Sequence, residues 1–214
     1  MNMECCGQRY IGCGLKCDKL TINGTPGNAM GAYLDGGTIE LRGNAQDAAG
    51  DTMNDGKIII HGSAGDALGL AMRGGVIYVR DDAGYRTGIH MKEYEDKKPV
   101  IVIGGTAGSF LGEYLAGGLI VVLGIGADCI PVGHFTGTGM HGGKIFIRTG
   151  KPLTNLPEQV AAEVASGEDM QEIAPYLHEF AGCFGMDAQA LLQDRFYLLT
   201  PNAKNPYHQL YVAN

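Results

Sequence analysis

The sequence predicts a mainly β protein: a single-stranded β-helix of about seven coils with a 19-residue repeat, followed by a C-terminal helical segment. Three observations lead to this prediction, namely the amount of glycine, its spacing and the alternation of apolar residues. Glycine contributes 35 of the 214 residues, roughly twice its usual share of about 7%.

The glycines recur at a regular spacing. Gly31 is followed by equivalents at three steps of 19 residues and then at two longer steps of 24 and 25 residues. With one step back, these marker glycines are Gly12, Gly31, Gly50, Gly69, Gly88, Gly112 and Gly137. The residue three positions after each marker is always Leu or Met: Leu15, Leu34, Met53, Met72, Met91, Leu115 and Met140. A period near 20 residues with a second column in register is typical of a repeat architecture.

Short strands are predicted just before most of the glycine clusters, because apolar residues there are spaced two apart. The pairs are Leu20 and Ile22, Ile39 and Leu41, Ile58 and Ile60, Ile77 and Val79, Ile101 and Ile103, Ile120 and Val122, and Ile145 and Ile147. One such unit cannot bury its apolar face alone, whereas stacked coils can.

The glycines between the strands are predicted to form corners, where positive φ and close approach of neighbouring coils require them. This applies to the stretch TPGNAMGAYLDGG, which we interpret as a corner rather than as a phosphate-binding loop. The literal G-x-G-x-x-G at Gly137, Gly139 and Gly142 falls on the repeat and opens no predicted helix, so it is not a dinucleotide site.

The repeat ends at Gly150, so we expect a glycine-repeat β-helix over residues 1–150 and a helical cap with an extended tail over residues 151–214. Asn155 is a candidate N-cap of a first helix. An amphipathic stripe at Met170, Ile173, Leu177, Phe180 and Phe184 predicts a second helix, and a short third one begins near Asp187. We expect these helices to cover one end of the solenoid, with a partner contact by the aromatic tail as the alternative.

Composition limits the kind of partner. The net charge of −7 and the absence of a Lys/Arg cluster argue against nucleic acid, and no apolar run approaches the roughly 18 residues of a membrane span. The N-terminus lacks the pattern of a signal peptide, so we expect a cytoplasmic protein whose six cysteines are free thiols. Four of these crowd the N-terminus, at Cys5, Cys6, Cys13 and Cys17, in a spacing that matches neither zinc nor ferredoxin sites; metal binding there is the less favoured alternative.

The repeat is broken in its fourth unit. Arg86 stands where the three preceding units carry Ala29, Ala48 and Ala67, and an insertion adds charged residues between Lys92 and Lys98. The favoured interpretation is a solvated loop with an internal Arg–Asp or Arg–Glu pair. The alternative is a docking site, because inserted loops of solenoids are often where partners bind; its candidate partner contacts are Arg86, His90, Lys92 and Glu93.

A longer insertion in the sixth unit carries Cys129 and His134. A nucleophile pair would require their mutual contact, which a sequence cannot show. An independent enzyme using this pair is therefore the least favoured hypothesis, and we assign no catalytic, cofactor-binding or metal-binding residue to this chain.

The motif G-x-x-G-x-x-x-G at Gly24, Gly27 and Gly31 recurs at Gly62, Gly65 and Gly69. With IGGTAGSFLGEYLAGGLIVVLG, it resembles the glycine-repeat (GXGXG) domain at the C-terminus of the large (α) subunit of glutamate synthase. The similarity is closest to the free-standing form found where that subunit is split into separate polypeptides. The resemblance implies a right-handed β-helix that holds no catalytic groups of its own.

The resemblance also implies partners. FMN and an iron–sulfur cluster are expected on a separate synthase subunit, and a glutamine amidotransferase subunit would complete the complex. The chain would be a non-catalytic scaffold between the two, and several copies of it could assemble. A related repeat domain forms a subunit of formylmethanofuran dehydrogenase, a molybdenum or tungsten enzyme, and this is the alternative assignment.

Overall fold

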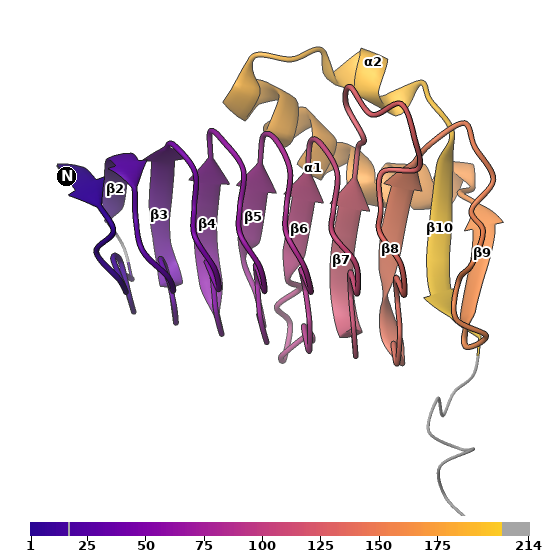
Figure 1. Cartoon of the computed structure of the whole chain (residues 1–214), viewed down its shortest axis with the longest axis horizontal. Helices are drawn as coiled ribbons and strands as arrows, with labels where there is room; N and C mark the ends of the chain where they lie inside the picture. The colour runs from indigo at the N-terminus through magenta and orange to yellow at the C-terminus, as the bar shows by residue number, and fades with distance from the viewer. Residues whose placement is uncertain (17, 203–214) are drawn as a thin grey trace, which may run out of the picture.

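The computed structural model describes residues 1–16 and 18–202, which form a β-solenoid with helices on one side (Figure 1). Consecutive parallel strands lie side by side in chain order, and β2 to β8 make about six turns. The strands are β1 (Asn2–Cys6), β2 (Lys19–Thr25), β3 (Asp35–Arg42), β4 (Asp55–Ile60), β5 (Val76–Val79), β6 (Val100–Ile103), β7 (Ala116–Val122) and β8 (Gly142–Arg148). The mainly β solenoid predicted from the repeat is confirmed, and β1 accounts for the additional coil counted in the sequence.

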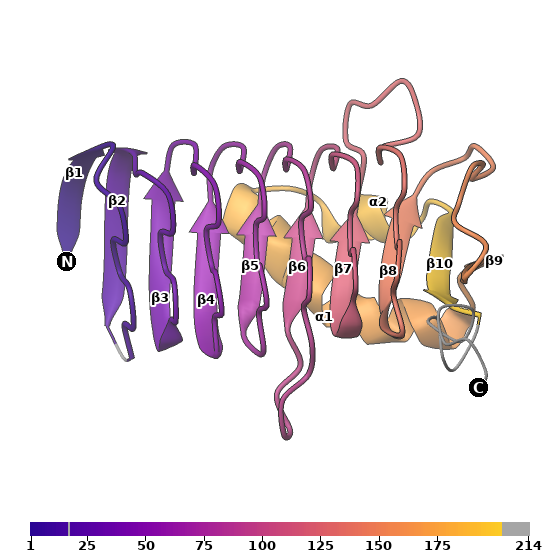
Figure 2. The same ribbon diagram turned by 60° about the horizontal axis from the view of Figure 1, so that its bottom comes forward.

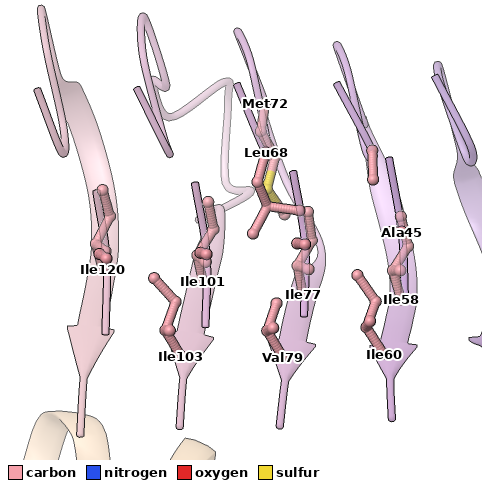
Figure 3. Close-up of a cluster of buried hydrophobic side chains, with 14 of the residues drawn as sticks. Ala45, Ile58, Ile60, Leu68, Met72, Ile77, Val79, Ile101, Ile103 and Ile120 are labelled. Atoms are coloured by element: carbon pink, nitrogen blue, oxygen red, sulfur yellow. The ribbon is translucent and has the colours of Figure 1, made fainter. Parts of the chain in front are cut away.

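The predicted apolar pairs fill the interior of the solenoid. Ile39, Ile58, Ile77 and Ile101 are aligned in register across four strands, and the second member of each pair forms a parallel column (Figure 3). The Leu and Met residues after the marker glycines are also fully buried, except Leu15, which is half-buried in the first connection. Both columns of the repeat therefore stabilise one continuous core.

The corner glycines have positive φ, as predicted, and so do some of the non-glycine residues beside them. Ala67, Gly69 and Ala71 have φ values of 54°, 66° and 51°. The N–H of Gly69 donates to Ala49 O in the preceding turn at 2.8 Å, whereas the N–H of Ala67 donates to Tyr85 O in the next turn at 2.7 Å. A Cβ built on Gly69 would lie 2.6 Å from Cδ1 of Ile101, so the marker position needs glycine for close packing as well as for φ.

The prediction of a helix starting at Asn155 is wrong. Asn155 has φ of 61°, and the segment forms strand β9 (Val160–Val164), followed by β10 (Phe196–Pro201) near the end of the described chain. β10 pairs antiparallel with both β8 and β9. Pairing with β10 therefore overrides the local helical pattern of VAAEV.

The predicted amphipathic helix is α1 (Gly167–Phe184), and a short helix α2 (Ala188–Leu192) follows it. Ser166 and Asp169 form a capping box at its start, and Gly185 ends it with φ of 66°. Its buried residues Ile173, Leu177 and Phe180 pack against the outer face of strands β5 to β8.

The helical segment thus lies along the side of the solenoid rather than over its end (Figures 1 and 2). Strands β10 and β9 cover the end beyond β8 instead. β5 and β6 are apolar on both faces, and a parallel sheet of that kind must be covered on both, which explains the position of α1. The predicted partner contact by the aromatic tail falls largely on residues 203–214, outside the described part of the chain.

Candidate functional site

A row of aromatic and cationic side chains distinguishes one stretch of the solenoid corner from the rest. We call it the aromatic corner, and it consists of Tyr85, Arg86, Phe110, His134 and Phe135. The equivalent positions hold Arg9 and Tyr10 in the first connection, and then Asn28 and Ala29, Asp47 and Ala48, and Asp66 and Ala67 in the next three. After three connections with small or short polar residues at these positions, the corner thus becomes aromatic and cationic from the connection that contains Gly88 onward.

The rings of the aromatic corner are in contact from turn to turn. The centroids of Tyr85 and Phe110 are 5.5 Å apart, and those of Phe110 and Phe135 are 4.9 Å apart with the rings stacked. Tyr85 and Phe135 are nevertheless 42% and 55% exposed. Arg86, Phe110 and Phe135 all adopt positive φ, a conformation unfavourable for large side chains, so the corner displays them at an energetic cost.

Arg86 is held between two rings and a carboxylate. Its Nε donates to Oε2 of Glu113 at 2.8 Å, and its guanidinium carbon lies 5.6 Å and 5.2 Å from the ring centroids of Tyr85 and Phe110. The hydrogen bond to Glu113 raises the pKa of Arg86 above its ordinary value. The internal Arg–Glu pair considered from the sequence is thus present, and it orients Arg86 on an exposed surface.

The other three candidate contacts have different surroundings. His90 stacks on Tyr114 with centroids 5.1 Å apart and planes 8° apart. Lys92 is exposed, whereas the carboxylate of Glu93 accepts a hydrogen bond from the N–H of Gly118 at 3.1 Å. Arg86 therefore belongs to the aromatic corner, while His90 and Lys92 line a hollow beside it.

The charged insertion is anchored rather than detached. Lys97 pairs with Asp55 at 3.2 Å, and Lys98 pairs with Glu172 of α1 at 2.7 Å. The loop projects from the solenoid between β5 and β6 (Figure 2). Its base is therefore bound to the preceding turns and to the helix.

Cys129 and His134 do not form a nucleophile pair in this structure. Cys129 lines a hollow of about 590 Å³ together with Arg148 and Arg195, and His134 lines a separate one of about 150 Å³ with Leu153. Five cysteines of the described residues are free: Cys5, Cys6, Cys13, Cys129 and Cys183. Within residues 1–16 and 18–202, no group of three His, Cys, Asp or Glu side chains could hold a metal ion, and no helix is long and apolar enough to cross a bilayer.

The sequence analysis missed Phe110 and Phe135. The signal was present, because both stand two residues before a marker glycine, in the same column as Arg86. Reading that column through all the units would have predicted an exposed aromatic row.

Comparison with known proteins identifies the repeat. The GXGXG motif family matches residues 2–202, which include the whole solenoid and its lateral helices. The chain belongs to the GXGXG motif family. This is the family of the C-terminal domain of glutamate synthase, as the resemblance implied.

One relative is similar to this chain over nearly its whole length. It is the protein of Methanocaldococcus jannaschii called "Uncharacterized protein MJ1350", which is 45% identical over 217 residues. The match covers 97% of this chain and 83% of the relative. The GXGXG fold with its C-terminal segment therefore recurs in that protein.

Proposed function

We propose that this chain is the non-catalytic scaffold subunit of a cytoplasmic glutamate synthase-like complex. It would position a synthase subunit, which carries FMN and an iron–sulfur cluster, against a glutamine amidotransferase subunit. The observation that carries this proposal is the match of the GXGXG family over residues 2–202. The reaction would occur on the partners, and this chain would supply a rigid frame for them.

The stacked solenoid suits a bracing role. Every turn is tied to its neighbours by the parallel ladder from β1 to β8, and α1 joins several turns through one apolar contact surface. Two subunits docked at different turns of such a frame would be held at a constant separation.

The aromatic corner is the surface we assign to a partner subunit. Aromatic residues and Arg are enriched at the centres of protein interfaces and dominate their affinity. Arg86 is already oriented by Glu113 and two rings, so little side-chain entropy would be lost on docking. The aromatic corner is therefore the part of the repeat best suited to recognition.

The complex is tested by affinity purification of the full chain from its native source, with identification of its partners and an absorption spectrum. Flavin and iron–sulfur absorbance together with glutamine-dependent glutamate formation is the expected result. A partner that carries a molybdenum or tungsten pterin would instead support the formylmethanofuran dehydrogenase-type alternative. A chain that purifies alone would contradict the scaffold role.

The docking surface is tested in the same purification with Phe135→Ala, which removes an exposed ring without changing any charge. An interface residue of this type contributes about 2 kcal/mol or more, roughly thirtyfold in affinity. Tyr33→Ala is the matched control, because Tyr33 is an equally exposed aromatic (54%) on an earlier turn with φ of 57°. Equal partner recovery with both variants would exclude the aromatic corner as the docking surface.

A further inference from the structure

A hollow of about 350 Å³ lies beside the aromatic corner, and its lining is entirely non-acidic. Arg73 and Lys92 contribute two positive charges, and His90 and His141 contribute two imidazoles. The whole chain carries a net charge of −7, so this lining reverses the sign of the protein locally. A concave, cationic lining is an electrostatic trap for anions.

The two cations of the hollow have no counter-ion among residues 1–16 and 18–202. Nε of Arg73 is buried and has no hydrogen-bond partner there, and neither Arg73 nor Lys92 takes part in an ion pair with a described residue. A buried donor without a partner costs free energy and calls for an explanation. A bound anion would supply the missing acceptor.

Three carboxylates of neighbouring turns already have partners. Asp55 pairs with Lys97 at 3.2 Å, and Asp35 pairs with Lys16 at 3.8 Å and with Lys97 at 4.0 Å. Glu93, next to Lys92, accepts the N–H of Gly118. Arg73 and Lys92 are therefore left to attract an anion from solution.

The backbone ladder places the two cationic residues on adjacent turns. The N–H of Arg73 donates to Met53 O at 2.8 Å and that of Lys92 donates to Met72 O at 3.0 Å. Arg73 and Lys92 thus leave adjacent rungs, about 4.8 Å apart. Side chains that start from neighbouring turns can reach the oxygens of one carboxylate or phosphate group, and a guanidinium can bind such a group through two parallel bonds.

The remaining walls leave room for a small ligand. Ala71 and Ala116 are the small residues of the lining, and the stacked rings of His90 and Tyr114 form a flat side wall. A volume of about 350 Å³ is at the lower end of the range of roughly 300–1,000 Å³ for ligand pockets.

We propose that this hollow is a binding site for a small compound that carries a carboxylate or phosphate group, with Arg73 and Lys92 as its charge partners. The proposal goes beyond the scaffold role and does not depend on it. It can be tested on the purified full chain without any partner, so the two proposals succeed or fail separately.

The experiment is isothermal titration calorimetry of the full chain with inorganic phosphate and, separately, with succinate at constant ionic strength. We expect saturable binding of at least one of the two, with one site per chain. Arg73→Gln and Lys92→Gln should each weaken it by about tenfold or more, since each removes a charge-assisted hydrogen bond. Lys16→Gln is the matched control, because Lys16 occupies the same column of the repeat and already pairs with Asp35.

A second variant keeps both charges and removes the space. Ala116→Leu should abolish binding while its thermal unfolding remains cooperative. If the wild-type chain binds neither phosphate nor succinate, the proposal is wrong. If Lys16→Gln and Lys92→Gln weaken binding equally, the anion is responding to general surface charge and the proposal is also wrong. If a folded Ala116→Leu variant binds the anion as the wild type does, the anion does not occupy this hollow.

Discussion

The corner glycines make a quantitative prediction at Gly69, where two costs can be separated. Alanine at this position must adopt φ of 66°, which costs about 1–2 kcal/mol for an L-residue. Its Cβ would also lie 2.6 Å from Cδ1 of Ile101, and such overpacking costs roughly 1–3 kcal/mol. We therefore expect Gly69→Ala to lower the free energy of unfolding by about 2–5 kcal/mol, measured by urea denaturation followed by circular dichroism.

Two further variants isolate the steric part. Gly14 has the same φ of 66° but nothing within 4 Å of an added Cβ, so Gly14→Ala reports the backbone cost alone. Ile101→Val removes the clashing Cδ1, and the next atoms, Cγ1 of Ile101 and Sδ of Met72, are both at an ordinary 3.6 Å. In that background Gly69→Ala should cost only the backbone amount, which gives a coupling energy of about 1–3 kcal/mol between the two positions.

The cycle can refute this reasoning. If Gly69→Ala costs the same in both backgrounds to within about 0.5 kcal/mol, the two sites are independent. Close approach between turns would then not be the reason for glycine at the corner.

Three further predictions concern the core, the lateral helix and pH. Met72→Ala truncates a fully buried side chain and should cost about 2–5 kcal/mol in a urea melt; an unchanged midpoint would mean that the column does not support the core. Phe180→Ala removes the α1 side chain that packs edge-to-face on Tyr78, with ring centroids 6.2 Å apart. It should lower the free energy of unfolding by about 3–5 kcal/mol, and hydrogen exchange should increase in α1 before it increases in the strands. Hydrogen bonds from Ser166 and the interaction with Lys144 lower the pKa of Asp169 in the folded protein. The ionised Asp169 therefore contributes its full stabilisation above the ordinary carboxyl pKa of about 3.9, and this stabilisation is lost as the pH falls through the lower pKa of the folded state. Asp169→Asn should therefore reduce the acid dependence of the unfolding free energy, and an identical pH profile for the two proteins would contradict this.

The solenoid core could be predicted in detail from the sequence. Residues such as Ile58, Ile77 and Ile101 contact their own equivalents in the next turn, so a periodic position in the chain is also a position in space. The one period thus predicts the strands, their register and the buried columns together.

The position of the lateral helix α1 could not be predicted from its local sequence pattern. The stripe at Ile173, Leu177 and Phe180 correctly predicted α1, but not the surface that it covers. The apolar outer positions Val102 and Val121 were a usable signal, because only a sheet covered on both faces has continuous apolar strands. The same limit applies to β9, whose strand form depends on its pairing with β10.

The sequence by itself determined the repeat, the register of the core and the positions at which the residues of the repeat change type. This is possible because each turn stacks directly on the next, so residues one period apart in the chain are neighbours in space. Only the tertiary structure decided which of the changed positions act together. Arg86 meets Glu113 and Phe110 through side-chain contacts between turns that no local pattern specifies. Likewise, no pattern in the sequence shows that the buried Nε of Arg73 has no hydrogen-bond partner among the described residues. The physical reason is that backbone pairing repeats along the chain, whereas the charge balance of a surface depends on which side chains are already paired.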